Sequence, residues 1–141
     1  MSWFPQVLVT AVAVQVFCQL FKLVFYSLRD RRFTPGYLVT AGGIPSAHSA
    51  FVTALSVAIG IRRGFDSDLF AVAFVFSAIV VYDAFRLRGH VQRHAQVINE
   101  AVLRPAGREP LSEMVGHSPT EIVAGVLLGG GVSALVTLAL G

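Results

Sequence analysis

Four long apolar segments restrict this sequence to one kind of fold. They span residues 4–28, 46–61, 69–87 and 121–140. A helix needs about 20 apolar residues to cross a hydrocarbon core of about 30 Å. Only 13% of the residues are charged, against about 25% in a typical soluble domain. We therefore predict an all-α integral membrane protein of about four transmembrane helices, forming one helical-bundle domain over residues 1–141. The second segment is short and can begin in the loop before it.

The first apolar segment differs from a secretory signal. No basic residue precedes it, and it is too long for the hydrophobic region of a signal peptide. It carries Gln15, Gln19 and Lys22 at a spacing that places them on one helix face. Polar groups inside a membrane helix are expected to point into the bundle. Cys18 is the single cysteine of the chain, which excludes an intramolecular disulfide.

Basic residues indicate the orientation in the membrane. They concentrate after the first segment and after the third, at Arg29, Arg31, Arg32, Arg86, Arg88, Arg93, Arg104 and Arg108. The loop between the second and third segments has only Arg62 and Arg63, and two aspartates offset them. Loops rich in arginine stay in the cytoplasm. We expect a multi-pass protein of the inner (plasma) membrane with both termini outside. Nucleic-acid binding is not expected, because no aromatic residues are interleaved with the basic ones.

This topology brings the ionisable groups to one end of the bundle. Lys22 lies near the end of the first helix, and Gly42–His48 and His117–Glu121 open the second and fourth at the same end. Asp83 and Arg86 close the third helix there. Helix N-termini carry about half a positive charge and bind phosphate groups. We predict one anion-binding site, facing the cytoplasm.

Structural explanations remain open for several of these residues. Pro45 and Pro119 suit the first turn of a helix. Ser118 and Glu121 have the spacing of a capping box, which satisfies a helix end without any catalysis. Asp83 and Arg86 have the spacing of an ion pair within one helix. Two histidines that open two facing helices are harder to explain structurally, so His48 and His117 are favoured as functional residues.

A further amphipathic segment is predicted on the cytoplasmic side, over residues 91–103. Val91, Ala95, Ile98 and Val102 form its apolar stripe. His90 and His94 have a spacing that can bind a metal ion. No carboxylate or cysteine joins them at ligand spacing, so no metal site is predicted.

Three motifs give the sequence a family resemblance. Residues 45–48, Pro-Ser-Ala-His, resemble the Pro-Ser-Gly-His motif of the type 2 phosphatidic acid phosphatase and vanadium haloperoxidase superfamily. His117, followed by Glu121 and a glycine-rich helix, resembles its closing motif. Lys22 and Arg29 have the spacing of its opening Lys-x6-Arg motif. The resemblance covers residues 22–129, and the short chain with Tyr82-Asp83-Ala84 looks like the divergent bacterial and plant branch.

Some positions depart from the superfamily pattern. Asp30 stands in place of a proline, Ala47 in place of a glycine, and Leu111 in place of an arginine. Arg88 is the expected substitute for that arginine. Arg88 also lies six residues before His94, which makes His94 a rival nucleophile, but Ile98 stands where an orienting acid is needed. His117 is therefore favoured.

The resemblance implies hydrolysis of a phosphomonoester without a metal or other cofactor. His117 would attack phosphorus, Glu121 would fix its tautomer, and His48 would protonate the leaving group. Phosphate would be held by the residues Lys22, Arg29, Ser46 and Arg88, with Asp83, Arg86 and His94 in supporting positions. A site at the membrane edge suits a lipid or polyprenyl phosphate or diphosphate.

Two other functions stay open. The departures above fit an inactive relative that binds lipid phosphate. Gln15 and Gln19 fit a small transport or structural subunit. For a transporter, a row of polar residues along the bundle is expected. The small residues Gly125, Gly129, Gly130, Gly131 and Ser133 suit close helix packing, either within the chain or in a homodimer through Gly125 and Gly129.

Overall fold

The computed structural model describes residues 6–38, 42–113 and 115–140, and its regular structure there is entirely helical. The elements are α1 (Gln6–Arg29), the 3₁₀ turn η1 (Pro35–Leu38), α2 (Ala47–Arg63), α3 (Asp68–Phe85), α4 (Leu87–Ile98), the π-helical turn η2 (Asn99–Leu103) and α5 (Pro119–Leu140). The predicted all-α membrane protein is confirmed. Three helical stretches are long and apolar enough to cross a membrane: α1, α3 together with α4 and η2, and α5.

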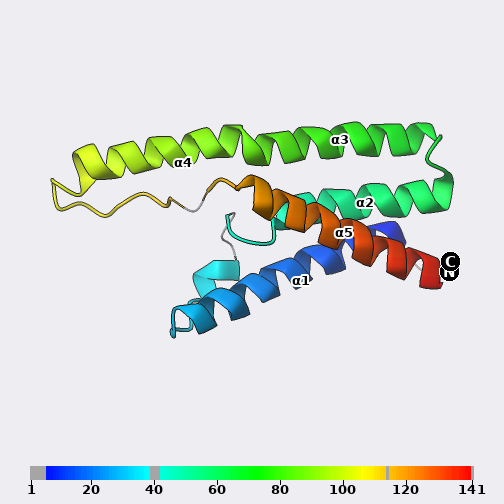
Figure 1. The fold of residues 1–141 in the computed structure, drawn as a ribbon, viewed down its shortest axis with the longest axis horizontal. Coiled ribbons are helices and arrows are strands. Elements are labelled where there is room, and N and C mark those ends of the chain that lie inside the picture. Colours follow the sequence, from blue (N-terminus) through cyan, green and yellow to red (C-terminus); the bar gives the residue numbers. More distant parts are fainter. Residues whose placement is uncertain (1–5, 39–41, 114, 141) are drawn as a thin grey trace.

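Helix α2 is the centre of the bundle (Figure 1) and packs against α1, α3 and α5. Its 17 residues span about 25 Å at about 1.5 Å per residue. Small buried residues, Ala47, Ala50, Ala54 and Ala58, let its neighbours approach closely. The chain runs up and down, so the end of α1, the start of α2, the end of α3 and the start of α5 lie at one end of the bundle (Figure 1).

The connection between α3 and α4 differs from the expectation. The sequence predicted that the third helix ends at residue 87 and that a separate surface helix begins at residue 91. Instead α4 starts at Leu87, and Arg86 has helical dihedral angles of φ −87° and ψ −61°. Its N–H still bonds to Tyr82 O at 2.8 Å. The two helices therefore form one rod (Figure 1). No proline interrupts the chain here, so nothing forces the helix to stop.

The glycines of α5 pack inside the chain. A Cβ atom on Gly125 would lie 2.4 Å from Ser46 O, and one on Gly129 would lie 2.2 Å from Ala50 O. Ser133 Oγ donates to Ala54 O at 2.7 Å. The face of α5 that carries these glycines is thus occupied by α2. Of the two roles left open for Gly125 and Gly129, the structure shows packing within the chain.

Replacing Gly129 with alanine should destabilise the protein. The new methyl group meets backbone atoms of α2 that cannot rotate away, and such overpacking costs about 1–3 kcal/mol. Gly131→Ala is the matched control, because a Cβ there meets nothing within 4 Å and alanine favours the helix by up to about 1 kcal/mol. Thermal unfolding in detergent should show Gly129→Ala melting below wild type and Gly131→Ala at or above it. Equal melting of the two variants would contradict the described α2–α5 contact.

Candidate active site

Two histidines from different helices lie side by side at the end of the bundle. His48 is the second residue of α2, and His117 lies two residues before the start of α5. Their ring centroids are 6.3 Å apart, with an angle of 63° between the ring planes. His117 is buried, with 5% of its surface exposed. The structure therefore brings together the two residues that the sequence favoured as functional.

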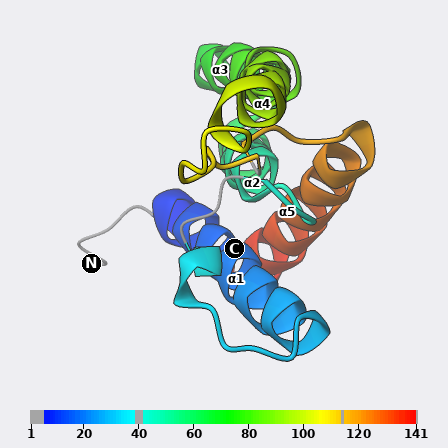
Figure 2. The ribbon, with the colours of Figure 1, turned by 90° about the vertical axis from the view of Figure 1, so that its left-hand side faces the viewer.

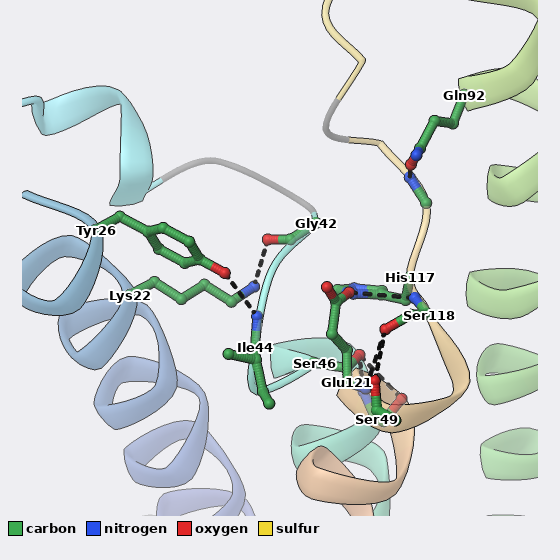
Figure 3. A network of polar contacts seen from close by, with 12 residues as sticks. Lys22, Tyr26, Gly42, Ile44, Ser46, Ser49, Gln92, His117, Ser118 and Glu121 are labelled. Atoms are coloured by element: carbon green, nitrogen blue, oxygen red, sulfur yellow. Dashed lines mark hydrogen bonds and ion pairs between the residues drawn. The ribbon is translucent and has the colours of Figure 1, made fainter. Parts of the chain in front are cut away.

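His117 is held in one orientation. Its Nδ1 lies 3.0 Å from Glu121 Oε2, and its backbone N–H bonds to Ala84 O at 3.4 Å. Figure 3 shows this imidazole against the Glu121 carboxylate at the start of α5. Among the described residues, Nε2 of His117 is buried and has no hydrogen-bond partner. One ring nitrogen is thus fixed, and the other has no partner among the described residues.

Glu121 also caps the helix, as the structural explanation required. Its Oε2 accepts from Ser118 N at 3.2 Å, and Ser118 Oγ accepts from Glu121 N at 3.3 Å. This is the reciprocal pattern of a capping box. The same carboxylate therefore satisfies the helix start and orients His117, and the two explanations of Glu121 do not compete.

The surroundings keep His117 neutral. Burial is the main cause that lowers the pKa of its imidazole below the ordinary value. The hydrogen bond that Glu121 accepts from His117 opposes this shift, while the positive charges of Lys22 and Arg88 lower the pKa further. An imidazole with a lowered pKa is unprotonated at neutral pH, so its Nε2 keeps the lone pair that a nucleophile needs.

The loop before α2 is fixed to α1. Lys22 is 1% exposed, and its Nζ donates to Gly42 O at 3.0 Å (Figure 3). Ile44 N donates to Tyr26 Oη at 3.1 Å. Gly43 has φ +93°, and a Cβ there would lie 2.8 Å from Tyr26 Oη, so this position favours glycine on both counts. The sequence interpretation missed Tyr26, although it follows Lys22 by four residues and shares its helix face.

Ser46 connects α2 to α5. Its Oγ accepts from Ser49 N at 3.3 Å, which makes it the N-cap of α2. Its own backbone N–H bonds to Glu121 O at 3.0 Å. The Ser46 hydroxyl, predicted as a phosphate ligand, is thus engaged as a cap in this structure. The N-termini of α2 and α5 meet at this contact.

Arg88 pairs with Asp83 across the joint between α3 and α4. Arg88 Nε lies 3.3 Å from Asp83 Oδ2, and about a third of each side chain is exposed, 33% and 38%. Asp83 thus pairs with Arg88, whereas the sequence interpretation considered Arg86 as its partner. Arg86 and His94 are exposed. Within the described ranges, no group of three or more His, Cys, Asp or Glu side chains is arranged to hold a metal ion.

Arg29 is engaged elsewhere. Its Nε lies 2.9 Å from Asp30 Oδ1, and its guanidinium lies 4.7 Å from the centroid of the Tyr26 ring. Tyr37 Oη donates to the same aspartate, and this bond is the main cause that holds the pKa of Asp30 below its ordinary value. Asp30 is the residue that replaces the expected proline. It binds Arg29 at the end of α1, so the Arg29 guanidinium is engaged by Asp30 and Tyr26 in this structure.

The segment before His117 is anchored to α4 by residues that the sequence interpretation did not identify. Gly116 N donates to Gln92 Oε1 at 3.1 Å (Figure 3). A Cβ on Gly116 would lie 2.9 Å from Gly89 Cα, so the two backbones touch. Asn99 is fully buried and bonds to Leu111 N and O, at 2.7 and 2.9 Å. These contacts have no local signal in the sequence, because they depend on how the loop folds back.

The comparisons with known proteins agree with this picture. The sequence matches the model of the divergent PAP2 family over residues 4–132. The uncharacterized membrane protein YuiD of Bacillus subtilis (strain 168) is 34% identical over 138 residues, which cover 86% of this chain and 87% of that protein. No solved structure matches the chain. The family match spans α1 to α5 and includes both histidine motifs, so this membrane protein belongs to the divergent PAP2 family.

Proposed function

We propose that the chain is a membrane-embedded phosphatase that hydrolyses a lipid or polyprenyl phosphate or diphosphate through a phosphohistidine on His117. The arrangement of Glu121 and the two histidines supports this proposal. The Nδ1 of His117 is held by Glu121, its Nε2 is buried without a partner among the described residues, and a second histidine lies 6.3 Å away. A fixed and neutral imidazole beside a proton donor suits nucleophilic attack on phosphorus.

The reaction proceeds in two displacements. First, Nε2 of His117 attacks phosphorus, the phosphorus–oxygen bond of the ester breaks, and His48 gives a proton to the departing alkoxide. Next, water attacks the phosphohistidine, the phosphorus–nitrogen bond breaks, and His48 takes the proton from that water. Proton transfer of this kind typically contributes about 10²–10⁴-fold to the rate. Inorganic phosphate leaves, and both histidines return to their starting states.

Positive groups stabilise the charge that develops on the phosphate oxygens. Lys22 and Arg88 are the cations whose charges act on His117. The N-termini of α2 and α5 meet at Ser46 and Glu121 and add their dipoles. Fixed charges of this type act where the transition state gains charge. Lys22 then exchanges its bond to Gly42 O for one to the substrate.

The packing of α1 disfavours the transport alternative. Its buried residues Ala11, Val14 and Cys18 pack against the alanines of α2. The side-chain oxygens of Gln15 and Gln19 are buried without partners in the described part of the chain. They lie beside this apolar core, and the core itself is filled with small side chains. A continuous polar path through the bundle would need polar side chains at the core positions where α1 and α2 have small apolar ones.

The proposed orientation puts the histidines on the cytoplasmic side of the inner (plasma) membrane. The start of α1 and the end of α5 lie at the opposite end of the bundle (Figure 1). The arginine-rich loops flank the site, which by the positive-inside rule faces the cytoplasm. A cysteine appended after Gly141 should react with a membrane-impermeant maleimide added to intact cells, whereas one at Thr34 should react only after lysis. The reverse pattern would show the opposite orientation.

Replacing Glu121 with glutamine should lower kcat and move the acid limb of the pH profile. In the Ser-His-Asp triad, loss of the carboxylate that orients the catalytic histidine lowers kcat by about 10⁴-fold. Glu121 raises the pKa of His117, so its removal lowers that pKa further, and the nucleophile stays unprotonated to lower pH. The acid limb of kcat/KM should therefore shift to lower pH in Glu121→Gln. The phosphate of the substrate titrates in the same way in assays of wild type and variant, so it does not contribute to the difference. An unchanged limb would show that Glu121 acts only as a helix cap.

Phosphate release from purified protein tests the proposed function. The panel contains phosphatidic acid, a polyprenyl phosphate, a polyprenyl diphosphate and a sphingoid phosphate, each in mixed micelles. We expect release from at least one of them, strong inhibition by vanadate and activity that survives a chelator. Vanadate imitates pentacoordinate phosphorus and is attracted by the same cations. Binding of a lipid phosphate without release from any of them would identify an inactive relative and overturn the proposal.

A further inference from the structure

One face of α2 begins at the candidate active site and is not covered by another of the described helices. We define the open face of α2 as His48, Phe51 and Leu55, which follow each other at intervals of three and four residues and so point to one side. All three are half-buried. Phe51 and Leu55 rest on the apolar core formed by α1 and α2. Leu55 lies about 10 Å along the helix axis from His48.

The other faces of α2 are occupied. Helix α5 covers the side of Ser46 and Ala50, where its glycines touch the backbone of α2. Helix α3 covers the side of Val52 and Ser56, where Ser77 Oγ bonds to Val52 O at 2.9 Å. Helix α1 covers the side of Ala47, which belongs to the apolar core together with Ala11, Val14 and Cys18 of α1. What remains is the strip between α1 and α3.

No helix closes that strip from outside. Within the described residues, no Cα atom of α1 lies within 8 Å of a Cα atom of α3. Figure 2, which looks along the bundle, shows α1 and α3 on opposite sides of α2, with α5 to the right. Among the described residues, no helix therefore covers the open face of α2, which ends at His48.

We propose that the open face of α2 binds one hydrocarbon chain of the substrate, so that the lipid enters sideways between α1 and α3. This inference rests on the proposed function, because it assigns the chain of the lipid whose phosphate lies between His48 and His117. Continuity with the histidine pair favours a lipid phosphate over a protein partner. Only a ligand with an anionic head and an apolar chain matches both ends of this strip. Phe51 and Leu55 then become specificity-determining residues.

Photo-crosslinking tests this placement without any need for turnover. A benzophenone amino acid replaces Phe51 in one variant and Phe74 in the other. Phe74 lies on α3, is 59% exposed and serves as the matched lipid-facing control. The full-length protein is placed in phosphatidylcholine nanodiscs with tritiated dodecylphosphonate, which cannot be hydrolysed. We expect strong labelling at position 51 that vanadate abolishes, and weak labelling at position 74 that vanadate does not change.

Other results overturn the inference. Equal labelling at the two positions, insensitive to vanadate, would mean that bulk lipid alone covers the open face. A crosslinked dimer from position 51 would mean that a second copy of the chain covers it. Phosphonate labelling at position 51 in a protein without hydrolysis would support the inference while the proposed function fails. Hydrolysis without labelling at position 51 would support the proposed function and overturn the inference about the open face of α2.

A steric variant provides a second measurement. Leu55→Trp adds bulk on the open face, and Val75→Trp adds the same bulk on α3, where Val75 is 57% exposed. The measured quantity is the ratio of kcat/KM for dodecyl phosphate to kcat/KM for phenyl phosphate, which lacks a chain. We expect Leu55→Trp to lower this ratio tenfold or more and Val75→Trp to leave it unchanged. An equal ratio in both variants would contradict the assignment.

Discussion

Replacing His117 with alanine should reduce phosphate release to background. Loss of a catalytic nucleophile costs on the order of 10⁴-fold or more, because the remaining groups have no covalent intermediate to stabilise. The measurement is kcat for the best lipid phosphate, with melting temperature as a check on folding. His94→Ala is the matched control, because His94 is exposed on α4 and is the rival nucleophile. Loss of activity in His94→Ala with activity retained in His117→Ala would reverse the assignment.

Replacing His48 with alanine should have an effect that depends on the leaving group. A lipid alkoxide is a poor leaving group and needs a proton, so kcat should fall about 10²–10⁴-fold, the usual contribution of a general acid. 4-Nitrophenolate leaves without a proton, so turnover of 4-nitrophenyl phosphate should fall much less. The measurement is the ratio of kcat for the two substrates in wild type and in His48→Ala.

The control for His48 is His90→Ala, since His90 is exposed and lies on the protruding helix α4. This variant should keep the wild-type ratio. An equal loss for lipid phosphate and 4-nitrophenyl phosphate in His48→Ala would show that His48 binds or positions the phosphate instead of donating a proton.

The sequence predicted the bundle and the meeting of the two histidines, because both follow from topology. Apolar length defined α1 and α5, and alternation of direction placed the start of α2 and the start of α5 at one end. His48 and His117 then had to lie near each other. The helix joint at Arg86 was missed, because a short polar interval looks like a loop in sequence although its backbone continues the helix.

Other contacts could not be predicted because several partners compete for the same side chain or helix face. Arg29 has the spacing from Lys22 that the Lys-x6-Arg motif requires, but its guanidinium contacts the Asp30 carboxylate and the Tyr26 ring. Small residues on α5 are equally suited to internal and intermolecular packing, and only the position of α2 decides between them. Contacts made by the returning loop, such as Gly116 with Gln92, depend on tertiary folding and have no local signal.

In the proposed mechanism, phosphate is transferred to Nε2 of His117. Wild-type protein mixed with a lipid labelled with ³²P in the phosphate, and quenched in alkali within one turnover, tests it most directly. A phosphorus–nitrogen bond is stable in alkali and labile in acid, so peptide mapping can locate the label. We predict alkali-stable, acid-labile label on the peptide that contains His117, and no label in His117→Ala. Label on His94 or on a carboxylate, with phosphate release at the normal rate, would contradict the claim.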